Sequence, residues 1–166
     1  MCIRDRQETY SKDSRKPNKV TYTNLEGDLL RRDFTVNAMA MDLLPNNFGN
    51  LYDPQNGLKD LLSKQLITPM DPDETFSDDP IRMMRAAYFS SKLNLKIDND
   101  CYESMSRQAE RIKIVSQERI TTEFTKILST DKPSIGLKIL QDVGLMKHIF
   151  PEIHVMYGME QTKEWK

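Results

Sequence analysis

The sequence predicts an α+β fold in which a front third with a few short strands precedes an all-helical remainder. Two observations support this division. Between residues 19 and 70, short runs of β-branched and aromatic residues alternate with turn residues, which is typical of short strands. From about residue 71 onward, apolar residues recur at helical spacing, and acidic residues precede the first of these runs. We therefore place a boundary near residue 70.

The front third contains signals for short strands and one short helix. Residues 19–24 (KVTYTN) have the composition of a strand, whereas residues 11–19 are polar and basic and predict a loop. Residues 34–41 (FTVNAMAM) alternate as a strand does, but alanine and methionine favour a helix. Residues 51–52 predict a short strand before a DPQNG turn. Residues 57–67 predict a short helix that leads into a last extended segment.

The remainder reads as a series of amphipathic helices. Residues 71–79 form an acidic stretch, which we interpret as a loop and the N-terminus of the helix that starts near Pro80. Ser116 is placed as the cap of a later helix, and Gly144 ends the last of them. The later helices are predicted at about residues 99–110, 116–129 and 132–142.

Composition excludes several classes of protein. The net charge of −1 creates no general attraction to nucleic acid, so a polyanion would need a local basic patch. No apolar run approaches the roughly 18 residues that span a bilayer, so we expect no membrane segment. Two cysteines, Cys2 and Cys101, provide neither a disulfide framework nor a metal cluster, and a cytoplasmic location is expected.

Asp79, Arg82 and Arg85 carry the first candidate site, in the stretch DDPIRMMRAAYF. Their spacing of three places them on one side of a helix. Aspartate accepts and arginine donates hydrogen bonds, which matches the edges of cytosine and adenine, each with an amino donor beside a ring-nitrogen acceptor. Uracil and guanine would leave these groups unpaired, at a cost of about 1–3 kcal/mol. The alternative is a simple salt bridge between side chains three residues apart.

Arg32 and Arg85 are the candidate phosphate ligands. The sequence has no GxxxxGK[ST] or GxGxxG loop, which leaves arginines as the available clamp. Arg31 and Arg32 are adjacent, and their charges repel unless something negative lies beside them. Asp33 follows directly and is a candidate acceptor for a ribose hydroxyl. The alternative is that residues 31–33 only cap a helix.

Four segments in this order resemble the tRNA nucleotidyltransferase and bacterial poly(A) polymerase family, and specifically the class II CCA-adding enzymes. They cover about residues 25–155 and read DLLRRDFTVNAMAMD, LYDPQNGLKDLLSKQLI, DDPIRMMRAAYFSSKLNL and QERITTEFTKIL. One RRDF alone would be weak evidence, whereas four consecutive segments at these gaps are specific. The resemblance implies the C-terminal part of a nucleotidyltransferase head, followed by a helical neck.

The resemblance also implies roles for individual residues. In this family the RRDFxxNA segment contacts the ribose and triphosphate, which implicates Arg32, Asp33 and Asn37. The EDxxR segment, here DDPIR, reads the base through Asp79 and Arg82. The DPxxGxxDL segment helps to couple movements of head and neck, and the ERIxxE segment braces the neck helices. The residues implied in these structural roles are Asp53, Gly57, Glu118 and Arg119.

Two positions depart from the family pattern. Asp78 replaces the first glutamate of EDxxR, which is a mild change. Tyr88 stands where the RxxRxxR repeat of this helix has its third arginine. A phenol can hydrogen-bond a phosphate but cannot neutralise it. We therefore expect triphosphate affinity to be weaker or to be carried by other groups.

The metal chemistry implied by the resemblance has no match in this chain. Family members use two Mg²⁺ ions held by a DxD pair on a strand. The two DxD matches here, residues 71–73 and 98–100, follow the RRDF segment and lie outside any apolar strand. We therefore assign no catalytic or metal-binding residue here and expect the carboxylates for Mg²⁺ upstream of this chain.

Both ends of the chain suggest an internal fragment. Residues 1–6 (MCIRDR) resemble the translation of a sequencing adaptor and are left out of the fold prediction. Residues 7–70 are then expected to belong to the head and residues 71–155 to the neck. Residues 156–166 are expected to begin a truncated segment, which in many bacterial relatives leads to an HD-type phosphohydrolase domain.

The expected function is that of a parent enzyme that transfers CMP and AMP from CTP and ATP to the 3′ end of tRNA without a template. This chain would carry the ribose, phosphate and base contacts and would itself be inactive. Within the family, the alternatives are a poly(A) polymerase and a CC- or A-adding enzyme. The alternative from another class is a non-catalytic helical RNA-binding or scaffold module.

Overall fold

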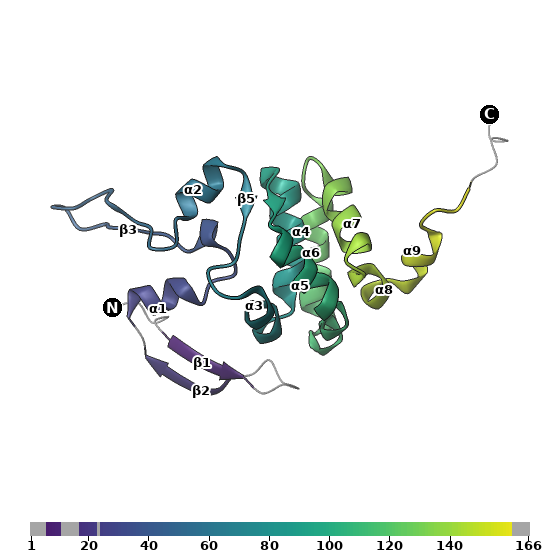
Figure 1. Ribbon diagram of the computed structural model, residues 1–166, viewed down its shortest axis with the longest axis horizontal. Helices are drawn as coiled ribbons and strands as arrows, with labels where there is room; N and C mark the ends of the chain where they lie inside the picture. The colour runs from purple at the N-terminus through teal and green to yellow at the C-terminus, as the bar shows by residue number, and fades with distance from the viewer. Residues whose placement is uncertain (1–5, 11–16, 23, 161–166) are drawn as a thin grey trace.

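The computed structural model describes residues 6–10, 17–22 and 24–160, and it is α+β, as predicted (Figure 1). The front part carries short strands and short helices. In chain order they are β1 (Arg6–Tyr10), β2 (Pro17–Tyr22), α1 (Leu25–Leu30), the 3-10 helix η1 (Thr35–Asn37), β3 (Ala40–Met41), β4 (Leu51–Tyr52), α2 (Gly57–Leu62) and β5 (Gln65–Leu66).

Several predictions for the front part are confirmed. The strand predicted at residues 19–24 is β2, although it begins at Pro17, inside the segment predicted as loop. The strand at residues 51–52 and the helix that leads into an extended segment are β4, α2 and β5. The ambiguous segment 34–41 contains both kinds of structure, a 3-10 turn and then β3. β1, which pairs antiparallel with β2, was not predicted.

The remainder of the described chain is mainly helical. Its elements are α3 (Pro72–Asp78), α4 (Ile81–Leu93), β6 (Lys96–Ile97), α5 (Asn99–Gln108), the 3-10 helix η2 (Ala109–Ile114), α6 (Gln117–Leu128), α7 (Pro133–Asp142), α8 (Leu145–Ile149) and α9 (Pro151–Met156). The helices predicted at residues 99–110, 116–129 and 132–142 are therefore confirmed as α5, α6 and α7 within a few residues.

Two expectations for this part were wrong in detail. The acidic stretch 71–79 is not a loop, because Asp71 caps a helix of its own, accepting hydrogen bonds from the backbone N–H groups of Asp73 and Glu74. Asp98 caps α5 in the same way, so the first aspartate of each DxD match is a helix cap. The remainder is also not purely helical, since β6 pairs in parallel with β5 and links it to the front part.

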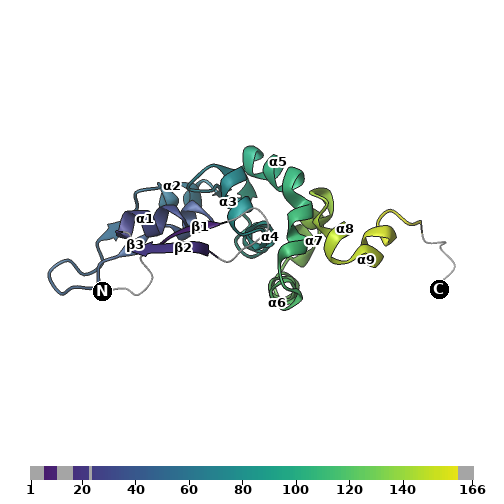
Figure 2. The same cartoon turned by 90° about the horizontal axis from the view of Figure 1, so that it is seen from below.

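The core lies among the central helices, where α4 packs against α6 and α7 and α3 packs against α5 (Figures 1 and 2). Met83, Met84 and Ile127 are fully buried there. Gly136 lets α7 approach α4 closely, because a Cβ atom at this position would lie 2.6 Å from Ser91 Oγ and 2.7 Å from Ile127 Cγ2. The central helices thus form a tightly packed body that the front part joins.

Other expectations fall partly outside the described residues. Of the residues attributed to an adaptor, 1–5 are not described, whereas Arg6 begins β1. Residues 161–166 are not described either. Among the helices that are described, none is both long and apolar enough to cross a membrane.

Candidate functional site: an arginine-lined pocket

The pocket lies where the segment after α1 meets the start of α4 and of α6, and its volume is about 330 Å³. Five arginines and two aspartates line it, so positive charge prevails. Its lining residues are Arg31, Arg32, Asp33, Asp79, Ile81, Arg82, Arg85 and Arg119. The pocket therefore brings together all of the predicted nucleotide-binding residues except Asn37.

Asp28 explains how two adjacent arginines are tolerated. It lies one turn before them on α1, and its carboxylate accepts hydrogen bonds from both Arg31 and Arg32. Burial raises the pKa of Asp28, but the hydrogen bonds from the two arginines outweigh burial and bring its pKa below the usual value. One carboxylate faces two guanidinium groups, so the pair still contributes net positive charge to the pocket.

Asp28 was not predicted from the sequence as the negative partner of Arg31 and Arg32. The spacings of three and four residues to Arg31 and Arg32 are the signal that could have identified it. The alternative interpretation, that residues 31–33 cap a helix, is confirmed for Arg31, which is the C-terminal cap of α1.

Asp33 connects the front part to the helical body. Its Oδ2 accepts a hydrogen bond from Arg85 Nε at 2.6 Å, across 52 positions of the sequence. Its Oδ1 accepts from the backbone N–H of Phe34 at 3.0 Å and from Asn37 Nδ2 at 3.1 Å. Asn37 therefore acts on the pocket through Asp33 and does not line it. The buried carboxylate of Asp33 is held in one orientation by three donors.

Asp79 does not lie on the helix that carries Arg82 and Arg85, which corrects the prediction. It is the C-terminal cap of α3 with an extended backbone (φ −142°, ψ 97°), and α4 begins two residues later. Its carboxylate pairs with Arg119 of α6, at 3.1 Å from Nη1 to Oδ1 and 2.7 Å from Nη2 to Oδ2. The alternative interpretation, a salt bridge between side chains three residues apart, is therefore also wrong, because the partner of Asp79 lies on another helix, 40 positions away.

The pocket has two walls, one formed by the segment after α1 and the other by the helical body, and Arg82 connects them. Its guanidinium donates to the backbone carbonyl of Arg31 at 2.9 Å and to that of Thr75 at 3.2 Å. The first carbonyl belongs to the front part and the second to α3. An arginine that holds two carbonyls in this way fixes the distance between the walls and keeps further donors for a ligand.

Arg119 reaches the pocket, although the resemblance implied only a structural role for it. Glu118 is exposed, and the only contact described for it is its backbone carbonyl, which accepts a hydrogen bond from Thr122. Glu123 is buried and pairs with Lys126 at 2.7 Å. The segment therefore places Arg119 in the pocket, directly beside Asp79.

Asp53 and Gly57 lie outside the pocket and organise the start of α2. The Asp53 carboxylate accepts hydrogen bonds from the backbone N–H groups of Gly57 at 2.7 Å and Leu58 at 2.9 Å. A Cβ atom at Gly57 would lie 2.0 Å from the carbonyl oxygen of Thr35, so only glycine fits there. This contact supports the segment after Asp33. Coupling between head and neck movements stays a prediction.

No metal centre is found in the part of the chain that the structure describes, since no three His, Cys, Asp or Glu side chains gather in a suitable arrangement. Asp71 and Asp98 cap helices, and the carboxylate of Asp73 accepts hydrogen bonds from Ser104 and Arg107. The residues present therefore do not fit a magnesium centre, and no chemical step is assigned to a metal.

Two family models match the chain. The "Poly A polymerase head domain" matches residues 2–67, and the "Probable RNA and SrmB-binding site of polymerase A" matches residues 94–157. Among curated relatives, the multifunctional CCA protein of Vibrio campbellii is 38% identical over 85% of this chain and 34% of its own length. The CCA-adding enzyme of Ligilactobacillus salivarius is 37% identical over 86% of this chain and 35% of its own length.

A solved structure gives the same result. The CCA-adding enzyme of Bacillus stearothermophilus in complex with CTP superimposes with a TM-score of 0.71, at 35% identity, over 76% of this chain and 31% of that one. The chain spans about a third of the length of these relatives. Sequence motifs, family models and fold agree, and the chain belongs to the tRNA nucleotidyltransferase and poly(A) polymerase family.

Proposed function

We propose that the whole protein transfers CMP and AMP from CTP and ATP to the 3′ end of tRNA without a template, and that this chain supplies the pocket for the incoming nucleotide. The observation that carries the proposal is the pocket itself, with its five arginines and two aspartates drawn from both parts of the chain. The similarity to CCA-adding enzymes, one of them solved with CTP, supports it.

The base would be read by Asp79 and Arg82. A carboxylate offers about four lone-pair positions, so Asp79 can accept from an exocyclic amino group while Arg119 holds both of its oxygens. Arg82 has donors beyond those used on the two carbonyls, and one would reach the ring nitrogen. Cytosine and adenine satisfy both groups. Uracil and guanine would place a carbonyl against the carboxylate.

The phosphates would be bound by Arg31 and Arg32 of the front part together with Arg85 of α4. Arg31 and Arg32 share one carboxylate, and Arg85 keeps its Nη groups beyond the Nε–Asp33 bond. Guanidinium groups bind phosphate oxygens in a bidentate manner, which suits a triphosphate. Asp33 would orient these groups and accept a ribose hydroxyl through a remaining lone pair. Mg²⁺ is expected to serve the transfer reaction, with ligands other than the residues described.

Family models that match residues 2–67 and 94–157 support a division of the chain into two functional parts. We propose that residues 7–70 act as part of the head and residues 71–155 as the neck. A poly(A), CC- or A-adding activity would use the same pocket, so nucleotide binding alone does not separate these activities. Nucleotide selectivity does separate all of them from a scaffold, which would have no reason to prefer CTP and ATP.

The test is a calorimetric titration of this chain with CTP, ATP, UTP and GTP. We expect CTP and ATP to bind more tightly than UTP and GTP by about 5- to 150-fold, which corresponds to about 1–3 kcal/mol. Asp79→Ala and Arg82→Ala should remove the preference. Arg107→Ala, an arginine paired with Asp73 outside the pocket, is the matched control and should keep it. Equal binding of all four nucleotides by the wild type would contradict the proposal.

A further inference from the structure

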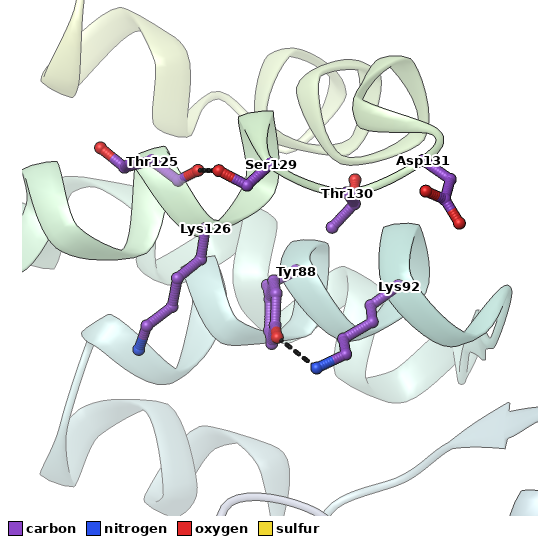
Figure 3. Close-up of a pocket in the computed structure, with 7 residues that line it drawn as sticks. All are labelled: Tyr88, Lys92, Thr125, Lys126, Ser129, Thr130 and Asp131. Carbon is purple, nitrogen blue, oxygen red and sulfur yellow. Dashed lines mark hydrogen bonds between the residues drawn. The ribbon is translucent and has the colours of Figure 1, made fainter.

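A second pocket, of about 320 Å³, lies beside the first along α4, between that helix and the C-terminal end of α6 (Figure 3). Tyr88 lines it three residues after Arg85, which lines the first pocket. Three residues advance a helix by about 4.5 Å, so a chain molecule lying along α4 passes directly from one pocket to the other. The lining residues are Tyr88, Lys92, Thr125, Lys126, Ser129, Thr130 and Asp131.

Tyr88 stands between two lysines. Figure 3 shows its ring between the side chains of Lys92 and Lys126, whose ammonium groups extend to the same side. Lys92 Nζ donates to the Tyr88 hydroxyl at 2.9 Å and lies 5.4 Å from the ring centroid. These distances place the ammonium beyond the hydroxyl end of the ring. The Phe89 ring also lies close to Tyr88, with 5.1 Å between the ring centroids and 55° between the ring planes, so a base would approach the Tyr88 ring from the pocket side.

The charges around this pocket favour an anion at its open side. Lys92 is exposed and forms no ion pair with any carboxylate in the described part of the chain. Lys126 pairs with the buried Glu123 at 2.7 Å but is itself about half exposed. Asp131 lies on the rim opposite Lys126 and limits the positive charge on its side (Figure 3). The cationic groups are thus those that flank the tyrosine.

Two of the hydroxyl groups that line the pocket donate to backbone carbonyls near the end of α6. Ser129 Oγ donates to the carbonyl of Thr125 at 2.9 Å, and Thr130 Oγ1 donates to the carbonyl of Ile127 at 2.8 Å. With their hydrogens used, these hydroxyls present acceptor lone pairs to the pocket. The pocket thus combines acceptors inside, an aromatic ring in the middle and two ammonium groups outside.

An aromatic ring with flanking lysines is the arrangement that binds single-stranded nucleic acid, since the ring stacks on a base and the lysines attract the backbone. The residues from α6 also lie within the range 94–157 matched by the RNA-binding family model. A free triphosphate would use the lysines but not the ring. The combination therefore favours a nucleotide of an RNA strand.

We propose that this second pocket, the Tyr88 pocket, holds one unpaired nucleotide of the RNA strand, with its base on the Tyr88 ring and a neighbouring phosphate at Lys92 and Lys126. The inference rests on the proposed function, because the strand is the 3′ end that receives the nucleotide bound in the first pocket. It also gives a role to Tyr88, which stands where an arginine was expected: its ring would stack on a base, whereas an arginine would neutralise a phosphate.

The test measures two ligands on the same variants of this chain. The anisotropy of a fluorescein-labelled single-stranded oligoribonucleotide ending in CC reports RNA binding, and calorimetry reports CTP binding. The variants are Tyr88→Ala, Tyr88→Phe, Lys92→Ala and Lys126→Ala. Lys138→Ala, an exposed lysine of α7 outside both pockets, is the matched control for loss of one charge. Circular dichroism melts verify that each variant is folded.

We expect Tyr88→Ala to weaken RNA binding about 5- to 150-fold, and Tyr88→Phe to stay within about twofold of the wild type because the ring is kept. Lys92→Ala and Lys126→Ala should each lower the slope of log affinity against log salt by about 0.7. Lys138→Ala should leave this slope unchanged. CTP binding should be unchanged in all of these variants.

Two results would overturn the inference: RNA binding of the Tyr88 and lysine variants equal to that of Lys138→Ala, or a loss of CTP binding in parallel with RNA binding. The second result would assign the pocket to the triphosphate. Failure of the proposed function has a different signature, namely RNA binding that depends on Tyr88 together with equal binding of CTP and UTP.

Discussion

The two walls of the arginine-lined pocket come from regions that are packed very differently. The helical body buries its largest core side chains completely, as at Phe76 and Met84, both 0% exposed. The front part leaves large apolar side chains in solvent, as at Leu43, 73% exposed, and Phe48, 71% exposed, in the turn between β3 and β4. Figure 1 shows this hairpin extending away from the body. One wall therefore belongs to the main core, and the other joins that core through a few buried side chains, such as Phe34 and Leu66, both 0% exposed.

Because of this difference, the polar residues of the pocket have two different roles. Asp33 with Arg85, and Arg82 with the carbonyl of Arg31, hold the front wall against the body. Asp79 with Arg119 acts entirely inside the body. Loss of the contact between Asp33 and Arg85 should alter how the walls meet, and loss of Asp79 should alter which base the pocket selects. Loss of Arg82 should do both, because this side chain holds the front wall and is also proposed to face the base.

The largest contrast is expected between two phenylalanines. Phe76→Ala should lower the free energy of unfolding by about 3–5 kcal/mol, because it empties a filled core position. Phe48→Ala should change it by no more than about 0.5 kcal/mol, because the ring is exposed. Urea denaturation followed by circular dichroism measures both. Equal losses for the two variants would show that the hairpin is as well packed as the body.

The contact between the walls should have an intermediate effect. Arg85→Ala leaves the buried carboxylate of Asp33 without its charged partner and should cost about 1–3 kcal/mol, at the lower end because Arg85 is partly exposed. Arg107→Ala breaks an exposed pair and should cost less than about 1 kcal/mol. A double-mutant cycle of Arg85 and Asp33 isolates the pair. A coupling energy near zero would mean that the walls are held together otherwise.

The cap of α2 should contribute less. Asp53→Ala removes acceptors for two backbone N–H groups and should cost about 1 kcal/mol. Lys59→Ala, on the exposed side of the same helix, is the control and should be nearly neutral. Hydrogen exchange of α2 amides measures the change where it occurs. Unchanged exchange in Asp53→Ala would contradict the capping role.

The smallest effect is confined to acid pH. The pKa of Asp28 is lowered in the folded state, so the unfolded state binds more protons and stability rises with pH. The contribution of Asp28 is therefore complete above the unfolded value of about 4 and is lost as the pH falls toward the folded value. Denaturation between pH 3 and pH 6 should show a steeper loss in the wild type than in Asp28→Asn. Parallel curves would contradict the assignment.

Local sequence patterns predicted much of this fold because they depend on neighbouring residues. The periodicity of residues 99–142 identified α5, α6 and α7, and the turn residues after Tyr52 marked the end of β4. The helix α3 was missed because its acidic residues read as a loop, although Asp71 before a proline is a capping signal.

The site itself was predictable as a set of residues but not as a set of contacts. The pairing of Asp79 with Arg119 spans 40 positions and depends on how α3 and α6 pack, which no local pattern encodes. The link from Asp33 to Arg85 is of the same kind. By contrast, Asp28 lies within one helical turn of the arginine pair, so its role was accessible from spacing alone.

The most direct test of base selection is to add a hydrogen-bond donor to the side chain at position 79. Asp79→Asn keeps the shape of the side chain but adds a donor, which suits the carbonyl of uracil as well as the amino group of cytosine. Calorimetric titration with CTP and UTP should show that the preference for CTP disappears or reverses in the variant. A preference for CTP that stays as large as in the wild type would contradict the claim that Asp79 reads the base.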